Sequence, residues 1–188
     1  MKTKTKIKIF GDRLAWKGKY NRIITREFIG INGKRGTWEI VERKAKGVVV
    51  IIIPVTKTGD VIFLKHFRIP RNGYVIESPA GLMDKIGESP RAVARRELLE
   101  ETGYRAQKII PVARVANNSG LMNEDYQIYL ATDCEKVAET THENAEDIEL
   151  IFIPLAEVET FFGQQRKISI AAPMYSIPYF LRRAGLIS

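Results

Sequence analysis

Residues 80–104 read AGLMDKIGESPRAVARRELLEETGY, and this stretch decides the fold class. Ser89 is typical of a helix N-cap, Pro90 of the first helical position and Gly103 of the residue that ends a helix. The residues between them are rich in Ala, Leu, Glu and Arg, which favour a helix. The sequence therefore predicts a helix over residues 91–102.

Alternating or apolar runs bounded by turn residues surround this helix. They predict strands at residues 7–10, 22–29, 37–43, 47–56, 61–67, 74–77, 106–115, 125–131 and 149–153. Asn32-Gly33, between two alternating runs, predicts a hairpin. Two more helices are expected, one from Pro154 to about Phe162 and one over residues 172–183 with a kink at Pro178. Strands, one helix, more strands and then helices indicate an α+β fold.

The composition excludes several classes of protein. With 188 residues, of which 45% are hydrophobic and 28% charged, the chain can form a soluble globular fold with a full core. The longest apolar run covers residues 48–55, whereas a membrane span needs about 20 residues. One cysteine, Cys134, excludes an intrachain disulfide, and two histidines are too few for a Cys/His zinc site. The start of the chain lacks the apolar region of a secretory signal, so we expect a cytoplasmic protein.

The net charge of +8 is unevenly distributed along the chain. Residues 1–46 hold 14 Lys and Arg against four Asp and Glu, and residues 47–188 hold 16 against 18. Lysines alternate from Lys2 to Lys8, which protects an edge strand from aggregation as readily as it binds phosphate. We interpret them as a solvated edge, so nucleic acid is not the expected partner. The charge pattern divides the chain into an N-terminal β subdomain, 1–46, and a larger domain, 47–188.

Three carboxylates of the predicted helix share one face, because Glu97, Glu100 and Glu101 are three and four residues apart. Like charges at this spacing destabilise a helix by a few tenths of a kcal/mol per pair, and a bound cation would offset that cost. Oxygen ligands without nearby Cys or His favour Mg²⁺ or Mn²⁺. A metal with an oriented water is what hydrolysis of a phosphoanhydride needs. The alternative is a solvated helix face, although Arg91 and Arg95 point away from the glutamates and do not neutralise them.

These residues resemble the Nudix box, whose pattern is Gly, five residues, Glu, seven residues, Arg-Glu-apolar-x-Glu-Glu-x-Gly-apolar. Residues 88–104 match every specified position, while Gly81 and Glu88 are separated by six residues, one more than in the pattern. Residues 77–81, ESPAG, resemble the sequence that precedes the box in the ADP-ribose and nucleoside-diphosphate-sugar pyrophosphatase group. The resemblance covers about residues 40–165. It implies a Nudix fold, an α/β/α sandwich with a mixed sheet and an N-terminal antiparallel β-hairpin subdomain.

The resemblance also implies roles for residues inside the box. The metal ligands would be the carboxylates of Glu97, Glu100 and Glu101 and the backbone carbonyl of Ala80. An ion pair between Arg96 and Glu88 would support them, and Mg²⁺ is the expected ion, with Mn²⁺ also possible.

Further roles fall outside the box. A general base would come from the acidic loop at residues 143–147, with Glu146 as first choice and Glu143 as second; the alternative is a merely solvated loop. The substrate would contact the side chains of Arg68, Glu77, Glu124 and Arg43. Arg68 and Glu77 could equally well only flank strand ends.

The implied activity is Mg²⁺-dependent hydrolysis of a nucleoside diphosphate linked to a sugar, first of all ADP-ribose to AMP and ribose 5-phosphate. The ADP-ribose group usually has a proline 16 residues after Gly103, where this chain has Ser119. Other Nudix substrates therefore stay open, namely GDP-mannose, UDP-glucose, a dinucleoside polyphosphate or an oxidised nucleotide. An alternative of another class is an inactive Nudix-like module that binds nucleic acid through its basic N-terminus. The resembled enzymes dimerise through such an N-terminal sheet, so a homodimer is expected.

Overall fold

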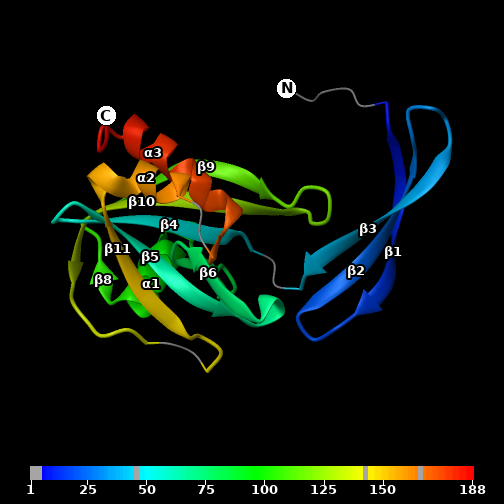
Figure 1. Cartoon of the computed structure of the whole chain (residues 1–188). Helices are drawn as coiled ribbons and strands as arrows, with labels where there is room; N and C mark the ends of the chain where they lie inside the picture. Colours follow the sequence, from blue (N-terminus) through cyan, green and yellow to red (C-terminus); the bar gives the residue numbers. More distant parts are fainter. Residues whose placement is uncertain (1–5, 45–46, 142–143, 165–166) are drawn as a thin grey trace. The chain divides into compact units, whose positions relative to one another are not determined.

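The computed structural model describes residues 6–44, 47–141, 144–164 and 167–188 (Figure 1). The chain forms two compact units. The first contains residues 1–47 and 115–125, and the second contains residues 48–114 and 126–188. Segment 115–125 thus belongs to the first unit, whereas the division of the sequence at residue 46 placed it in the larger domain.

The first unit is built on an antiparallel sheet in the order β1-β2-β3, with β1 at Lys8–Lys17, β2 at Asn21–Ile29 and β3 at Arg35–Arg43. The hairpin between β2 and β3 is confirmed: Gly33 has φ of 78°, and the Asn32 side chain accepts a hydrogen bond from the Lys34 backbone at 3.0 Å. β1 extends beyond the predicted strand at residues 7–10. Two register shifts interrupt its pairing with β2 and obscure the alternation of its side chains.

Several large apolar side chains of β1 are exposed in the single chain. Ile9, Phe10, Leu14 and Trp16 each show more than half of their surface to solvent. Apolar side chains gathered on one strand are typical of a surface that another protein covers.

The second unit contains a mixed sheet, which has nine strands within the described residues. Its main path runs β12-β6-β5-β4-β10-β8, with β11 paired to β5, β7 to β4 and β9 to β10. The strands are β4 (Val49–Thr56), β5 (Asp60–Arg68), β6 (Gly73–Glu77), β7 (Ala80–Leu82), β8 (Tyr104–Arg105), β9 (Lys108–Asn117), β10 (Glu124–Lys136), β11 (Ile148–Pro154) and β12 (Ser169–Ile170). The sequence did not predict β7, β8 and β12, because two or three residues are too few to show a period of two.

Helix α1, at Pro90–Thr102, has the ends that the sequence predicts. Ser89 Oγ accepts a hydrogen bond from the Ala92 backbone at 3.2 Å, and Gly103 ends the helix with φ of 75°. The apolar face of α1 packs on β4 and β10, because the following buried side chains form one cluster: Val93, Ala94, Leu98, Val50, Ile52, Tyr129 and Ala131. This packing leaves the glutamates of α1 outside the apolar cluster, on the side of the helix that faces β7.

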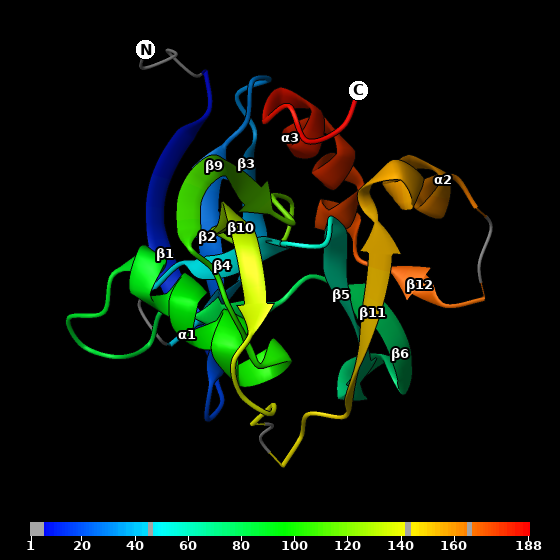
Figure 2. The same ribbon diagram turned by 90° about the vertical axis from the view of Figure 1, so that its left-hand side faces the viewer.

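The C-terminal helices lie on the other side of β4 and β5 from α1 (Figure 2). A 3₁₀ turn at Leu155–Glu157 leads into α2, Val158–Gly163, and the Phe161 ring stacks on Phe63 of β5 at 5.4 Å between centroids. The kink predicted at Pro178 is wrong. A 3₁₀ turn at Ala172–Ser176 ends there, and Pro178 lies in the first turn of a separate helix, α3, Ile177–Arg183. The first turn tolerates a proline, because its N–H groups have no partner inside the helix.

The α+β fold with a mixed sheet between helices is confirmed by this arrangement. In the described part of the chain, no helix has the length and apolar character needed to cross a lipid bilayer.

Candidate active site

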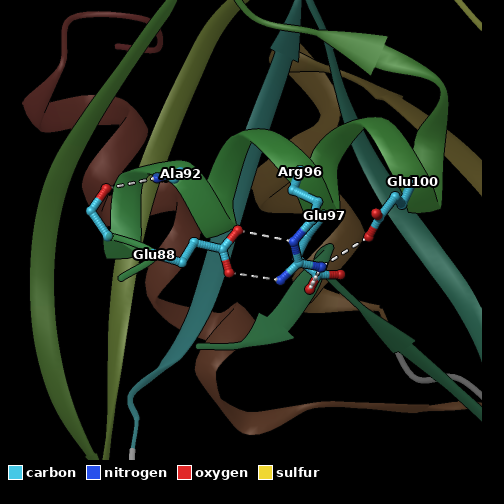
Figure 3. A network of polar contacts seen from close by, with 6 residues as sticks. Glu88, Ala92, Arg96, Glu97 and Glu100 are labelled. Atoms are coloured by element: carbon cyan, nitrogen blue, oxygen red, sulfur yellow. Dashed lines mark hydrogen bonds and ion pairs between the residues drawn. The ribbon is translucent and has the colours of Figure 1, made fainter. Parts of the chain in front are cut away.

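The Arg96 guanidinium donates hydrogen bonds to three carboxylates around the site (Figure 3). Its Nε and Nη2 donate to the two carboxylate oxygens of Glu88 at 3.0 and 3.2 Å. Its Nη1 donates to Glu97 at 2.6 Å and to Glu100 at 2.9 Å. The hydrogen bonds from Arg96 hold the pKa of Glu88 below its ordinary value. The predicted ion pair between Arg96 and Glu88 is therefore present, and the same arginine orients two of the expected metal ligands.

Glu101 is the most buried carboxylate of the group, with 4% of its surface exposed. Its Oε2 accepts a hydrogen bond from the Ala80 backbone N–H of β7 at 2.9 Å, which ties the helix to the strand before the box. Burial raises its pKa to about 8, and the neighbouring charges of Glu97 and Glu146 act in the same direction. Burial also raises the pKa of Glu97. These carboxylates repel one another in a poorly solvated place, so a cation would stabilise them.

These side chains line a cavity of about 440 Å³. Its lining consists of Ala80, Gly81, Leu82, Asp84, Lys85, Arg96, Glu97, Glu100, Glu101, Thr141 and Glu146. The structure thus brings Glu146, far along the sequence, to the same cavity as the glutamates of α1. Glu143, the second choice for the base, lies outside the described residues.

The segment before Glu146 is attached to the end of α1. The backbone N–H of Thr141 donates to the Glu100 carbonyl at 2.8 Å, and the N–H groups of Val137 and Ala138 donate to the Gly103 carbonyl at 2.9 and 3.1 Å. Because both carbonyls belong to the C-terminal end of the helix, these bonds satisfy groups that an isolated helix leaves unpaired. They also guide the acidic loop back toward the cavity.

The predicted substrate residues form two separate pairs. Arg68 at the end of β5 donates through Nε to Glu77 of the adjacent β6 at 2.8 Å. The positive charge of Arg68 lowers the pKa of Glu101, opposing the larger effect of burial. Arg43 and Glu124 both belong to the first unit and pair with each other, Nε to Oε1, at 2.7 Å. Neither pair contributes to the lining of the cavity.

Five residues of the lining were not predicted as site residues, namely Gly81, Leu82, Asp84, Lys85 and Thr141. Asp84 and Lys85 belong to the loop with one residue more than the Nudix pattern, and that extra length was the available signal. Lys85 places a cation among the carboxylates. Thr141 carries no sequence signal, since its place depends on the backbone bond to α1.

Gly81 allows the close approach of β7 to the glutamates. A Cβ atom built on Gly81 would collide with the carboxyl group of Glu97. We expect Gly81→Ala to displace that carboxylate from its place beside Arg96 and to lower kcat about tenfold or more, with little change in melting temperature. Steady-state kinetics and a thermal melt check this, with Gly73→Ala as the control because its Cβ would meet only ordinary contacts. A kcat equal to that of the control would contradict the expectation.

The raised pKa of Glu101 predicts a pH dependence of stability. Below its ordinary pKa of 4.5 this carboxyl is protonated in both states, whereas between 4.5 and about 8 only the folded chain keeps the proton. The unfolded state then binds fewer protons, so the contribution of this group to stability falls as the pH rises through that window. We expect the melting temperature of the metal-free protein to fall between about pH 5 and pH 8 more steeply than that of Glu101→Gln. Parallel curves for the two proteins would contradict this.

The donor set fits a hard divalent cation. The carboxylates of Glu97, Glu100, Glu101 and Glu146 line one cavity, and these oxygen donors are accompanied there by neither Cys nor His. Over the described ranges, no three acidic, histidine or cysteine side chains already stand as a complete metal site. In this structure the positive charge of Arg96 partly neutralises the carboxylates of Glu97 and Glu100.

Comparisons with known proteins agree with this geometry. The family model of the NUDIX domain matches residues 45–172, more than half of the chain. The ADP-ribose pyrophosphatase of Bacillus subtilis (strain 168) is 32% identical over 157 residues, which cover 82% of each chain. The ADP-sugar pyrophosphatase of Mus musculus is 30% identical over 193 residues, which cover 94% of this chain and 88% of the mouse protein.

A solved structure, described as the crystal structure of an ADP compounds hydrolase, shares the fold. It superposes with a TM-score of 0.80 at 19% identity, over 100% of both chains. With the box residues on α1 around one acidic cavity and a family model that spans most of the sequence, the chain belongs to the Nudix family of pyrophosphohydrolases.

Proposed function

We propose that the protein hydrolyses the diphosphate bond of a nucleoside diphosphate linked to a sugar, with Mg²⁺ as cofactor and ADP-ribose, split to AMP and ribose 5-phosphate, as the first candidate substrate. The observation that carries the proposal is the cavity lined by four glutamates together with Arg96 and Lys85. Both Bacillus subtilis ADP-ribose pyrophosphatase and mouse ADP-sugar pyrophosphatase, by their names, act on substrates of this class.

The cation would be held by Glu97, Glu100 and Glu101, together with the Ala80 carbonyl. When bound, it would neutralise charge on the diphosphate and make a water molecule nucleophilic near neutral pH. Arg96 keeps Glu97 and Glu100 on one side of the cavity through its Nη1. The backbone N–H of Ala80 in β7 holds the Glu101 carboxylate through a hydrogen bond.

Glu146 is the proposed general base, and the proton it would accept is that of the attacking water. Its position in the lining supports this role. Lys85 would bind a phosphate oxygen from the loop before α1. Arg68 and Glu77 would contact the phosphate and the ribose or base, with Arg43 and Glu124 as further substrate contacts.

A screen of phosphate-containing products tests the proposed substrate class. Wild-type protein is incubated with ADP-ribose, GDP-mannose, UDP-glucose, a dinucleoside polyphosphate and an oxidised nucleotide, each with Mg²⁺, with Mn²⁺ and with excess chelator. We expect hydrolysis that requires the metal and is fastest with ADP-ribose. Faster turnover of another compound would make that compound the substrate and leave the protein a Nudix hydrolase. The comparison is needed because Ser119 stands where the ADP-ribose group usually has a proline.

The alternative of an inactive nucleic-acid-binding module predicts the opposite pattern. It requires binding of RNA or DNA in a gel-shift assay with no metal-dependent hydrolysis of any diphosphate in the screen. The presence of all the box carboxylates in one cavity favours the enzyme.

We also propose a homodimer formed by the N-terminal subdomain, residues 1–46, beside a catalytic domain at 47–188. The exposed apolar side chains of β1 support it, since burying them would remove a large apolar area from water. Light scattering should give the mass of two chains for the wild type and of one chain for Leu14→Lys. Ile110→Lys, which changes an exposed apolar residue of β9, is the control and should stay dimeric. A wild-type mass of one chain would refute the dimer.

We also propose a cytoplasmic location. The lone cysteine, Cys134, supports it, because a chain without an intrachain disulfide is typical of a reducing compartment.

A further inference from the structure

Asp147, the residue directly after the proposed base Glu146, is held at two points. The backbone N–H of Phe67 in β5 donates to the Asp147 carbonyl at 2.9 Å. The hydroxyl of Tyr74 in β6 donates to the Asp147 carboxylate at 2.6 Å. One of these bonds acts on the backbone and the other on the side chain, so both the path of the chain and the orientation of residue 147 are constrained.

The Tyr74 ring is itself fixed by its neighbours. It packs edge-on against Phe67 with 5.4 Å between ring centroids, and the Lys65 ammonium lies 4.8 Å from its centroid. Phe67 and Tyr74 are also partners in the pairing of β5 with β6. The hydroxyl that reaches Asp147 therefore belongs to a side chain that packs on the paired strands β5 and β6.

Glu146 needs such support, because its neighbours in the cavity repel it. The charges of Glu97 and Glu101 act on Glu146, as shown by its share in raising the pKa of both. A base must stay within hydrogen-bond reach of the proton it takes, and displacement by about 1 Å can cost up to a hundredfold in rate.

We propose that Tyr74 is a positioning residue for catalysis, which acts by holding Asp147 and thereby keeps Glu146 directed at the reacting water. This inference rests on the proposed function and deepens it. Tyr74 acts from the strand edge through Asp147 and makes no contact with the reacting atoms.

The test is the kinetics of Tyr74→Phe, which removes one oxygen atom and keeps the ring contacts with Phe67 and Lys65. We expect kcat for ADP-ribose to fall about tenfold, with KM for substrate and for Mg²⁺ unchanged. Asp147→Ala should lower kcat by a similar factor, whereas Asp147→Asn keeps an acceptor for the hydroxyl and should retain most of the activity. Tyr179→Phe, a change at an exposed tyrosine of α3, is the matched control and should match the wild type.

A double-mutant cycle with Glu146→Gln separates positioning from a general structural effect. If Tyr74 works through Glu146, Tyr74→Phe has no further effect on kcat once Glu146 has lost its basic oxygen. Thermal melts of all variants confirm that each is folded. The inference would be overturned if the two losses in kcat multiplied in the double variant. It would also be overturned if Tyr74→Phe had the kcat of the wild type.

The same measurements distinguish this inference from the proposed function. Wild-type hydrolysis combined with full activity of Glu146→Gln would overturn the inference and leave the hydrolase intact. No hydrolysis by the wild type of any nucleoside diphosphate sugar would overturn both.

Discussion

Glu101→Gln should lower kcat about 10³-fold while leaving the protein folded. Glu101 is the most buried of the proposed metal ligands, and it receives the Ala80 N–H at 2.9 Å. A neutral amide can still accept that hydrogen bond through its oxygen, but it no longer offers a negative charge to a cation. Loss of one anionic ligand removes several kcal/mol of transition-state stabilisation, and each 1.4 kcal/mol is a factor of ten in rate.

Stability separates this loss of activity from a folding defect. Since burial raises the pKa of Glu101 to about 8, the ionised side chain is unfavourable in the metal-free fold. The melting temperature of metal-free Glu101→Gln above pH 8 should therefore equal or exceed that of the wild type. Glu139→Gln changes a carboxylate whose side chain is 90% exposed, and it serves as the control with wild-type kcat. An unchanged rate in Glu101→Gln would refute the metal role of this residue.

Gly103→Ala should destabilise the protein by about 2 kcal/mol or more. Gly103 has φ of 75°, a conformation that costs any other L-residue roughly 1–2 kcal/mol. A Cβ atom at this position would also collide with the backbone carbonyl of Ala138, which cannot rotate away as a flexible side chain could. The strain therefore falls on the backbone junction between α1 and the segment that leads to Glu146.

Urea unfolding monitored by circular dichroism measures this loss. Gly163→Ala is the matched control, because its φ lies outside the left-handed region and its Cβ would meet no neighbour within 4 Å. We also expect kcat of Gly103→Ala to fall under conditions where it stays folded, since the bonds from Val137 and Ala138 to the Gly103 carbonyl guide the acidic loop. Equal stability of the two alanine variants would contradict the argument.

Local signals determined the helix that carries the site. Ser89, Pro90 and Gly103 set the ends of α1, and the same three roles appear in the structure. The spacing of Glu97, Glu100 and Glu101 predicts a shared face, because the period of a helix depends on backbone geometry alone. The pairing of Arg96 with Glu88 and Glu100 also follows from residues close in sequence.

Contacts between distant segments could not be predicted in this way. β1 continues to Lys17 because β2 pairs with it across two bulges, and the alternation that would have shown this is lost at those bulges. Likewise, Arg43 pairs with Glu124 in the first unit, although both were expected simply as substrate residues.

The sequence alone thus determined the chemistry of the site, since the residue types and their helical spacing bring carboxylates and an arginine together. Only the tertiary structure decided which other groups join them: Lys85 and Glu146 enter the cavity, and Tyr74 holds Asp147. The physical reason is that β5 pairs with β6, and that backbone hydrogen bonds join Thr141 to α1 and Asp147 to β5. Such contacts between distant segments have no period that can be read along the chain.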